Sequence, residues 1–401
     1  MKIKNKYLDF VLIIIFNLIF FSIALQDFSF FSFFKFIDEI IALIGVLFIL
    51  LEIIKNGIQI KRFKYILVLS IIVLFYLIYS YVLEIQGLFS IIIDFITLIK
   101  FFSSIYFFYY IIKKLQIKYM PNLLVSEVRI IVYIYFLLTI AFYLFNIFPA
   151  YEIRYGIKCL RLFYPNYTVF ANSLIFLLIF LYKYNNKSII ILLTILSFMI
   201  VFTFRSKSIA FLVIFWAFIV IEKLKSKSVQ FIILSCALIL AIYLSIDKII
   251  FYFIEIDDSA RNVLYKTSIQ IANSNIFGYG FGSFGSAQSG ISYSIVYTIY
   301  GIDNIYGLSI NNSSFISDTF WPMIIGQFGY PGLIIYILIL ISLIKKILSA
   351  YNKKIKIMMF MSLILLIINS FAESSFVHPM SIMFAFLIGV GFAEDKMQTR
   401  I

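Results

Sequence analysis

Long apolar runs alternate with short polar segments along the whole 401-residue chain. The hydrocarbon core of a bilayer needs about 20 apolar residues per helix, and most of these runs approach that length. We therefore predict an all-α integral membrane protein with about 12 transmembrane helices. The predicted spans lie near residues 7–25, 36–54, 65–83, 89–112, 130–148, 166–182, 188–204, 208–221, 229–247, 322–344, 357–371 and 379–393.

The composition excludes a soluble fold, because 63% of the residues are hydrophobic and only 13% are charged. The net charge of +14 comes from lysine clusters between the apolar runs, which indicates a positive-inside topology, and we expect no nucleic-acid partner. Cys159 and Cys236 are predicted at different depths, so neither a disulfide nor a cysteine metal site is expected. The apolar run after MKIKNKY has no small-residue cleavage site, and we expect it to remain as a first helix.

The basic residues orient the predicted spans. With a cytoplasmic N-terminus, the inner connections and both termini carry 23 of the 33 Lys and Arg residues, so both termini are predicted to be cytoplasmic. Residues 1–247 then form nine spans, 248–320 form one large extracytoplasmic loop with short helices, and 321–401 form three spans and a cytoplasmic tail. All belong to one membrane domain. A loop of this length is usually functional.

Arginine is distributed differently from lysine. Four of the seven arginines are predicted on the outer side, against the orientation rule: Arg154, Arg161, Arg205 and Arg261. The chain uses lysine wherever a point charge suffices, so these arginines indicate a need for the planar five-donor fork that grips phosphate or carboxylate. They predict an outward-facing site for an anionic group. The alternative is that they anchor helix ends or pair with Glu152, Asp257 or Asp258.

Two charged residues, Asp94 and Lys100, fall inside the fourth predicted span. Their spacing of six residues places them on different faces of a helix, so a direct ion pair between them is not expected. Intramembrane charges are functional candidates by default. A structural role is the competing interpretation, because both lie within reach of neighbouring helices.

Five stretches of the chain carry a family pattern: RLFYPNYTVFAN (161–172), TFRSKSIAFLVI (203–214), ARNVLYKTSIQIANSNIFGYGFGSFGS (260–286), SDTFWPMIIGQFGYPGLIIYILIL (317–340) and ESSFVHPMSIMFAFLIG (373–389). In this order they resemble the O-antigen polymerase and ligase superfamily. The resemblance is strongest to the Wzy-type polymerases of repeat-unit polysaccharides. The many-helix layout with one large outer loop before the last spans fits the same superfamily.

The resemblance implies a GT-C-like polytopic glycosyltransferase in the cytoplasmic (inner) membrane of a bacterium, with its active site on the outer face. Its substrates would be undecaprenyl-pyrophosphate-linked oligosaccharides for O-antigen of lipopolysaccharide, capsule or exopolysaccharide, and it would need neither nucleotide nor metal. A flippase and a chain-length regulator would act in the same pathway. Ligases of the superfamily commonly carry a histidine in the long outer loop, whereas the only histidine here is His378, which counts against a ligase.

The resemblance also assigns roles to arginines. The serine-arginine motif of the family corresponds to Phe204-Arg205-Ser206, which implies that Arg205 contacts phosphate. Arg161 and Arg261 match two further arginines of the family pattern. Arg154 is a fourth candidate, ranked after these three. Such guanidinium groups would stabilise the negative charge that develops on the leaving pyrophosphate.

A general base near the outer membrane surface would take the proton of the attacking sugar hydroxyl. Asp318 is the first candidate, with helix N-capping as the alternative. Glu373 and His378 flank the last outer turn and are the other candidates, although His378 precedes Pro379 and an interfacial or capping role competes. Trp321 is a candidate for stacking on sugar, or it belongs to the aromatic belt of the membrane interface.

The stretch Gly280-Phe281-Gly282-Ser283-Phe284-Gly285 satisfies the G-x-G-x-x-G spacing of dinucleotide-binding turns. That fingerprint also needs a buried strand before it and a helix after it, whereas here a predicted helix precedes it, so a nucleotide site is not expected. We expect Gly280 and Gly282 to let the backbone lie close to a neighbour. The neighbour is either lipid pyrophosphate or sugar, reached by backbone N–H groups, or another outer loop.

Two other functions stay open. An O-antigen ligase-type glycan transferase would use the same kind of lipid-linked donor. A lipid-linked oligosaccharide flippase, or another transporter, would also attract phosphate with arginines. The long outer loop and the one-sided distribution of candidate groups count against a transporter, which needs a path accessible from both faces.

Overall fold

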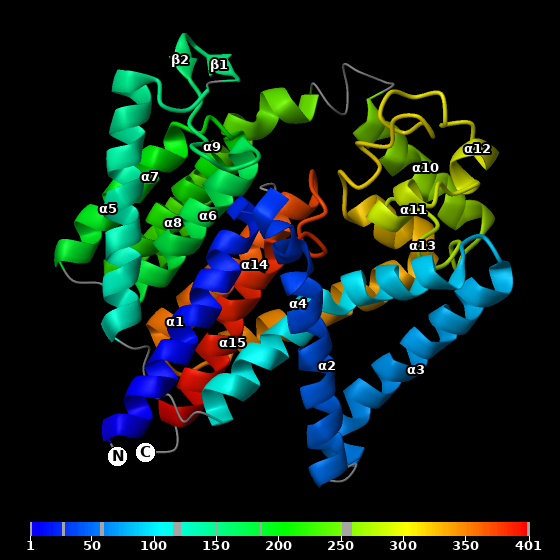
Figure 1. The fold of residues 1–401 in the computed structure, drawn as a ribbon, viewed down its shortest axis with the longest axis horizontal. Coiled ribbons are helices and arrows are strands. Elements are labelled where there is room, and N and C mark those ends of the chain that lie inside the picture. Colours follow the sequence, from blue (N-terminus) through cyan, green and yellow to red (C-terminus); the bar gives the residue numbers. More distant parts are fainter. Residues whose placement is uncertain are drawn as a thin grey trace.

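The computed structural model describes residues 2–25, 29–56, 60–114, 122–149, 151–184, 187–250 and 259–398. Helices dominate this part of the chain (Figure 1). Twelve of its helices each overlap one of the predicted apolar segments: α1 (Lys2–Leu25), α2 (Ile37–Asn56), α3 (Ile60–Leu83), α4 (Leu88–Lys114), α5 (Asn122–Phe145), α6 (Tyr167–Tyr182), α7 (Lys187–Val201), α8 (Ser206–Lys223), α9 (Lys227–Ile250), α13 (Trp321–Leu348), α14 (Lys353–Ser370) and α15 (Ser381–Gln398).

Several of these helices are apolar enough to cross a membrane. Among the described residues, four combine sufficient length with high hydropathy: Leu88–Lys114, Asn122–Phe145, Lys227–Ile246 and Trp321–Leu348. Shorter apolar helices lie at Phe10–Leu25, Ile72–Leu83, Tyr167–Tyr182 and Ser188–Val201. The all-α class and an association with membranes therefore follow from the structure. The number of spans and their orientation stay predictions.

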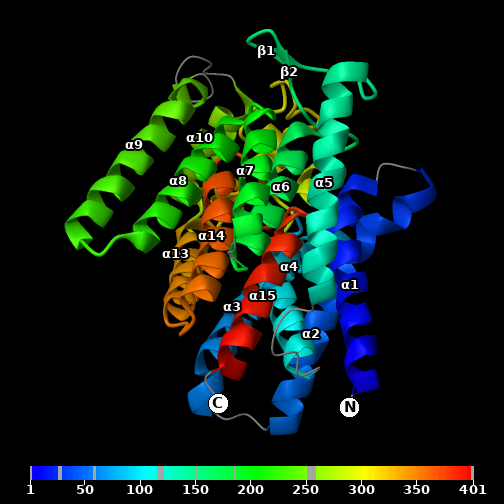
Figure 2. The same ribbon diagram turned by 90° about the vertical axis from the view of Figure 1, so that its left-hand side faces the viewer.

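The bundle is packed around α6, whose side chains are almost all buried. Aromatic rings from distant segments meet there: Phe16 of α1 stacks on Phe176 of α6, with ring centroids 5.6 Å apart, and contacts Phe386 of α15 edge-on at 6.2 Å. α4 packs most extensively on α2 and α15, and α9 packs on α8 at the edge of the bundle (Figure 2). Large aromatic side chains fill the core because offset and edge-on ring contacts pack densely.

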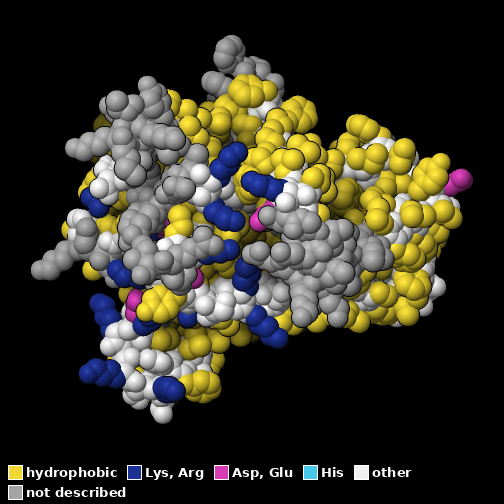
Figure 3. Space-filling view, turned by 90° about the horizontal axis from the view of Figure 1, so that it is seen from below, with side chains coloured by type: hydrophobic (Ala, Val, Ile, Leu, Met, Phe, Trp, Pro, Cys, Tyr) yellow, Lys and Arg dark blue, Asp and Glu magenta, His cyan; other side chains and the backbone are white. Residues whose placement is uncertain are grey.

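The two ends of the bundle differ. Both termini lie at one end, and the face seen from that end gathers Lys and Arg side chains (Figures 1 and 3). The opposite end carries the hairpin of β1 (Ile153–Arg154) and β2 (Ile157–Lys158), together with the short helices that follow α9 (Figures 1 and 2). The hairpin was not predicted, because strands of two residues leave no hydrophobic period to detect.

Residues 259–320 form a small unit at that end. It contains α10 (Ala260–Ser274), α11 (Ala287–Ile291) and α12 (Val296–Ile299). Its core is separate from that of the bundle and includes Leu264, Ile271, Phe284, Tyr297 and Leu308. The predicted loop began at residue 248, but α9 continues to Ile250, and residues 251–258 lie outside the described part of the chain.

A break in α13 frees backbone carbonyls, and hydrogen bonds to these carbonyls hold the small unit on the bundle. Gly329 has φ 61°, which only glycine adopts readily, and a Cβ atom there would lie 1.8 Å from the carbonyl oxygen of Ile276. The freed carbonyls of the first half of α13 accept bonds from the glycine stretch, including Gly280 N–H to Gln327 O at 2.8 Å. Tyr76 of α3 donates to Phe328 O at 2.7 Å. Carbonyl groups before the break therefore keep partners.

The two intramembrane charges have structural partners. Lys100 forms an ion pair with Asp38 of α2 and a longer one, at 3.5 Å, with Glu39. Asp94 accepts the backbone N–H of Gly282 at 2.8 Å and so ties α4 to the small unit. As predicted from their spacing, Asp94 and Lys100 do not pair with each other. Both cysteines are free, Cys159 buried and Cys236 exposed, so the expected absence of a disulfide is confirmed.

Candidate functional site

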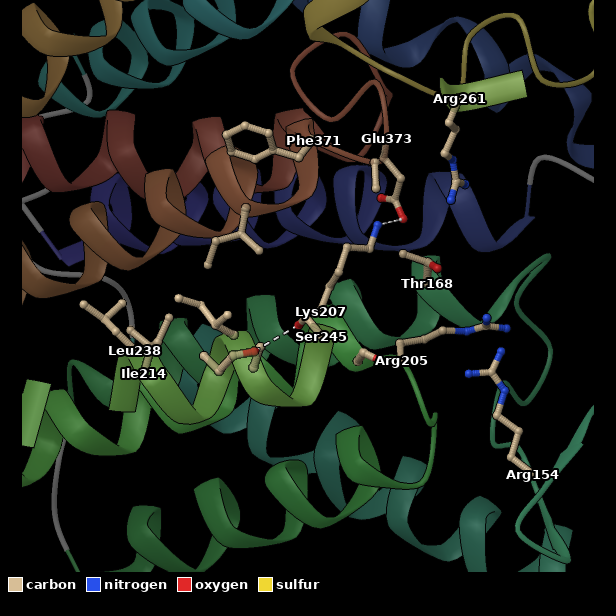
Figure 4. Close-up of a pocket in the computed structure, with 16 residues that line it drawn as sticks. Arg154, Thr168, Arg205, Lys207, Ile214, Leu238, Ser245, Arg261, Phe371 and Glu373 are labelled. Carbon is tan, nitrogen blue, oxygen red and sulfur yellow. Dashed lines mark hydrogen bonds and ion pairs between the residues drawn. The ribbon is translucent and has the colours of Figure 1, made fainter. Parts of the chain in front are cut away.

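A cavity of about 480 Å³ lies between α8, α9 and α14 at the end of the bundle opposite the chain termini. Four cations line one end of it: Arg154, Arg205, Lys207 and Arg261. The other end is apolar and is lined by Ala210 and Ile214 of α8 and by Leu238, Ala241 and Ile242 of α9 (Figure 4). The cavity is thus amphipathic, with a cationic end and an apolar end.

Arg154 and Arg205 meet on one carboxylate. Glu152 Oε1 accepts from Nε of Arg154 at 2.6 Å and also from its Nη2, while Oε2 accepts from Nη2 of Arg205 at 2.7 Å. Arg154 Nη1 donates to the carbonyl of Phe204 at 2.9 Å, which attaches the hairpin to the turn before α8. Burial raises the pKa of Glu152, but the hydrogen bonds and charges of both arginines outweigh it, and the net pKa is lowered.

The other two cations also face carboxylates. Lys207 pairs with Glu373, from the turn after α14, and Arg261 Nη2 lies 3.1 Å from Asp318 Oδ2. Burial raises the pKa of Asp318 above its ordinary value, and the nearby Arg261 offsets only part of that effect. Glu373 and Lys207 also act on this pKa, so Asp318 lies within electrostatic reach of the cavity. Tyr265 O–H donates to Phe371 O at 3.0 Å and holds α10 against the same turn.

The N-terminus of a helix also lies at the cationic end of the cavity. α8 begins at Ser206, a lining residue, directly after Arg205. Phe204 has φ 51° and turns the chain sharply between α7 and α8. The N-terminal end of α8, with the positive end of its helix dipole, therefore lies at the cavity, which favours an anion there.

Arg161 lies beside the cavity and does not line it. Its guanidinium carbon lies 4.0 Å from the ring centroid of Tyr151 and 5.8 Å from that of Tyr167, and its Nη1 donates to Pro165 O at 2.6 Å. Arg205 covers the same Tyr167 ring at 4.6 Å. Cation–π contacts of this kind orient the planar groups. Arg161 therefore supports Arg205 through Tyr167.

His378 and Trp321 do not line the cavity, although Trp321 contacts the lining residue Phe371. His378 Nδ1 accepts the backbone N–H of Met380 at 3.2 Å at the start of α15, and burial lowers its pKa. This is the capping arrangement that competed with the catalytic interpretation. Trp321 Nε1 donates to Ser370 Oγ at 2.9 Å, and its ring contacts Phe371.

Gly280 and Gly282 lie against α3, α4 and α13. A Cβ atom on Gly280, where φ is 81°, would lie 2.4 Å from Ser80 Oγ. The N–H of Gly280 donates to Gln327 O, and that of Gly282 donates to Asp94. These groups are occupied by the protein and do not line the cavity, so the close neighbour predicted for the glycines is a set of helices.

Sequence reasoning missed two features of the cavity. The pairing of outer arginines with Glu152, which was the alternative interpretation of the sequence, is confirmed for Arg154 and Arg205. No role was predicted for Lys207, although that residue follows Arg205 by two positions. Part of the apolar end comes from one face of α9, residues 238, 241 and 242, whose spacing is helical and was visible in the sequence. Asp257 and Asp258, the other proposed partners, lie outside the described residues.

Within the described residues, no group of three or more His, Cys, Asp or Glu side chains is placed to hold a metal ion. The expectation of a metal-independent site stays a prediction. No protein-family model, curated protein or solved structure matches this chain.

Proposed function

We propose that this protein is a membrane polysaccharide polymerase that joins lipid-diphosphate-linked oligosaccharide repeat units. In each cycle, a hydroxyl oxygen of the incoming unit attacks the anomeric carbon of the growing chain. A glycosidic bond forms, and the bond from that carbon to the pyrophosphate oxygen breaks. The lipid pyrophosphate leaves with the electron pair, and the hydroxyl proton passes to a carboxylate. No nucleotide is needed, because the donor bond carries the energy, and the resemblance to the superfamily implies that no metal is needed.

The amphipathic cavity is the observation that carries this proposal. A polyprenyl diphosphate has an anionic group joined to an apolar chain, and the cavity has four cations joined to an apolar wall. Its volume of about 480 Å³ is in the range of small-molecule sites. Three of the four arginines singled out on the predicted outer side line it, although they are separated by up to 107 positions in the chain.

The arrangement supports a role for each group. Arg154, Arg205 and Arg261 would bind the pyrophosphate and stabilise the charge that develops on it as the bond breaks. Asp318 is the favoured proton acceptor, because its raised pKa brings it nearer to the range in which a carboxylate is an effective base. Glu373 is the alternative, since it also lies at the cationic end.

The predicted setting belongs to the same proposal. The cavity would open on the outer face of a bacterial cytoplasmic membrane, with the Lys-rich end inside. A flippase would supply the repeat units, and a chain-length regulator would act with the polymerase.

Deletion of the gene and identification of the glycan that remains tests the proposal. We expect a single repeat unit transferred to its final carrier, and restoration of long chains by the intact gene. Long chains stranded on undecaprenyl pyrophosphate would overturn the proposal and indicate a ligase. Repeat units trapped on the cytoplasmic leaflet would also overturn it and indicate a flippase.

A further inference from the structure

Glu152 occupies the position that an anion would take between two guanidinium groups. Its two oxygens are divided between Arg154 and Arg205, with Oε1 bound by the first and Oε2 by the second. Arginine forks bind phosphate oxygens in the same manner. The lowered pKa of Glu152 keeps this carboxylate charged at neutral pH. The Glu152 carboxylate therefore acts as an internal anionic ligand of the cationic end.

The cavity as a whole is nearly neutral. Four cations face three carboxylates, namely Glu152, Asp318 and Glu373, in the pairs described above. A site built only to attract anions would leave its cations unpaired. Here a ligand competes with a carboxylate for Nε and Nη2 of Arg154 and for Nη2 of Arg205, and that competition weakens the binding of any anion that uses these donors.

The lipids of the surrounding membrane are themselves potential ligands of the cationic end. The headgroups of a bilayer contain phosphodiesters, each with one negative charge, in great excess over any lipid-linked sugar. Four unpaired cations next to an apolar wall would bind the phosphodiester and the acyl chain of any such lipid that fits the cavity. Specificity requires that such abundant competitors be disfavoured as well as that the substrate be favoured.

We infer that Glu152 is a specificity-determining residue that keeps the cavity clear of the phosphodiesters of ordinary anionic membrane lipids. The inference rests on the proposed function, since it takes a lipid diphosphate as the ligand to be admitted. A diphosphate diester carries two negative charges and contacts more of the cations at once, so it displaces Glu152. A phosphodiester carries one charge and binds too weakly to occupy the site at the concentration of bulk lipid.

Binding in nanodiscs tests this inference. The ligand is a synthetic farnesyl diphosphate sugar, which is a diphosphate diester. The membrane is phosphatidylcholine, whose choline cation compensates the charge of its phosphodiester, with increasing fractions of phosphatidylglycerol, whose phosphodiester charge is uncompensated. For the unaltered protein we expect the apparent Kd to change little as phosphatidylglycerol increases. For Glu152→Gln in pure phosphatidylcholine we expect tighter binding, by about tenfold, because the internal competitor has lost its charge.

The decisive result is the response of Glu152→Gln to phosphatidylglycerol. A tenfold gain in affinity extends to the phosphodiester as well, so its apparent Kd for the probe should rise steeply with phosphatidylglycerol by simple competition. Glu152→Asp keeps the charge and should behave like the unaltered protein. Glu52→Gln makes the same charge change at Glu52 of α2, which pairs with Lys113 outside the cavity, and should also leave binding unchanged.

Two results would overturn the inference. Weaker probe binding by Glu152→Gln would mean that Glu152 positions the arginines instead of competing for them. Tighter binding that stays insensitive to phosphatidylglycerol would mean that it excludes no lipid. Neither result depends on sugar transfer, so the inference and the polymerase proposal fail separately: the first in nanodiscs, the second in the glycan of the deletion strain.

Discussion

The substitution Arg205→Lys tests whether the cavity needs a fork or only a charge. Arg205 Nη2 reaches Glu152 at 2.7 Å while the guanidinium plane covers Tyr167 at 4.6 Å. A lysine ammonium is a point charge with no plane, so it cannot make the stacked contact and present two parallel N–H groups to phosphate. The net charge of the cavity stays the same, and only the geometry of the donors changes.

The magnitude follows from comparable sites. Removal of one preorganised donor from a developing negative charge costs about 2.7–4 kcal/mol, or about 10²–10³ in kcat. Lysine keeps part of the electrostatic attraction, so we expect the lower end, a loss of about 100-fold. The assay is polymer formation by membrane vesicles from a synthetic lipid-diphosphate repeat unit, with chain lengths resolved on a gel.

The control is Arg129→Lys, which makes the same chemical change in α5 outside the cavity lining. The amounts of both variants in the membrane should match the unaltered protein. A wild-type rate and wild-type chain lengths in Arg205→Lys would refute the reasoning, because they would show that positive charge alone suffices. An equal loss in Arg129→Lys would refute it as well.

Two further predictions concern the protonation of Asp318 and the backbone conformation at Gly280. Since burial raises the pKa of Asp318, the charged form of this base should be lost as pH falls through a value above the ordinary 3.8. A pH–rate profile should therefore show a loss of activity on its acid side. If the same acid-side loss persists in Asp318→Asn, Asp318 is not the base. Gly280→Ala should lower the thermal unfolding midpoint more than Gly156→Ala, because both have positive φ, 81° and 76°, but only the first Cβ meets an atom, Ser80 Oγ at 2.4 Å. The second substitution costs about 1–2 kcal/mol of backbone strain, and the first adds about 1–3 kcal/mol of overpacking; equal midpoints in thermal melts would contradict this.

Helix positions could be predicted from the sequence because they depend on local hydropathy alone. Each long helix overlaps a run of apolar residues whose length is its own signal. The break in α13 also had a local signal, since Gly329 and Pro331 interrupt an apolar run. The separate core of residues 259–320 had none, because Leu264, Phe284 and Leu308 meet only after the chain folds back on itself.

The cavity could be predicted only in part. The excess of outer arginines indicated an anion site, and three of those residues do converge. Their partners could be named only in part: Glu152 was expected and does contact Arg205, which is 53 positions away, whereas the pairing of Arg261 with Asp318 was not expected. Arg161 shows the limit most clearly, because its rarity suggested direct binding, whereas it stacks on Tyr151 and Tyr167.

One wall of the cavity has little support. α9 contributes Leu238, Ala241 and Ile242 to the apolar end, yet among the described elements it packs extensively on α8 alone. Its displacement from α14 would break few contacts and would leave the core around α6 intact. In the proposed function, a ligand whose chain is already dissolved in lipid would therefore enter sideways, within the plane of the membrane. In the proposed cycle, the spent polyprenyl carrier would leave by this lateral opening and the next donor would enter by it, without either chain passing through water.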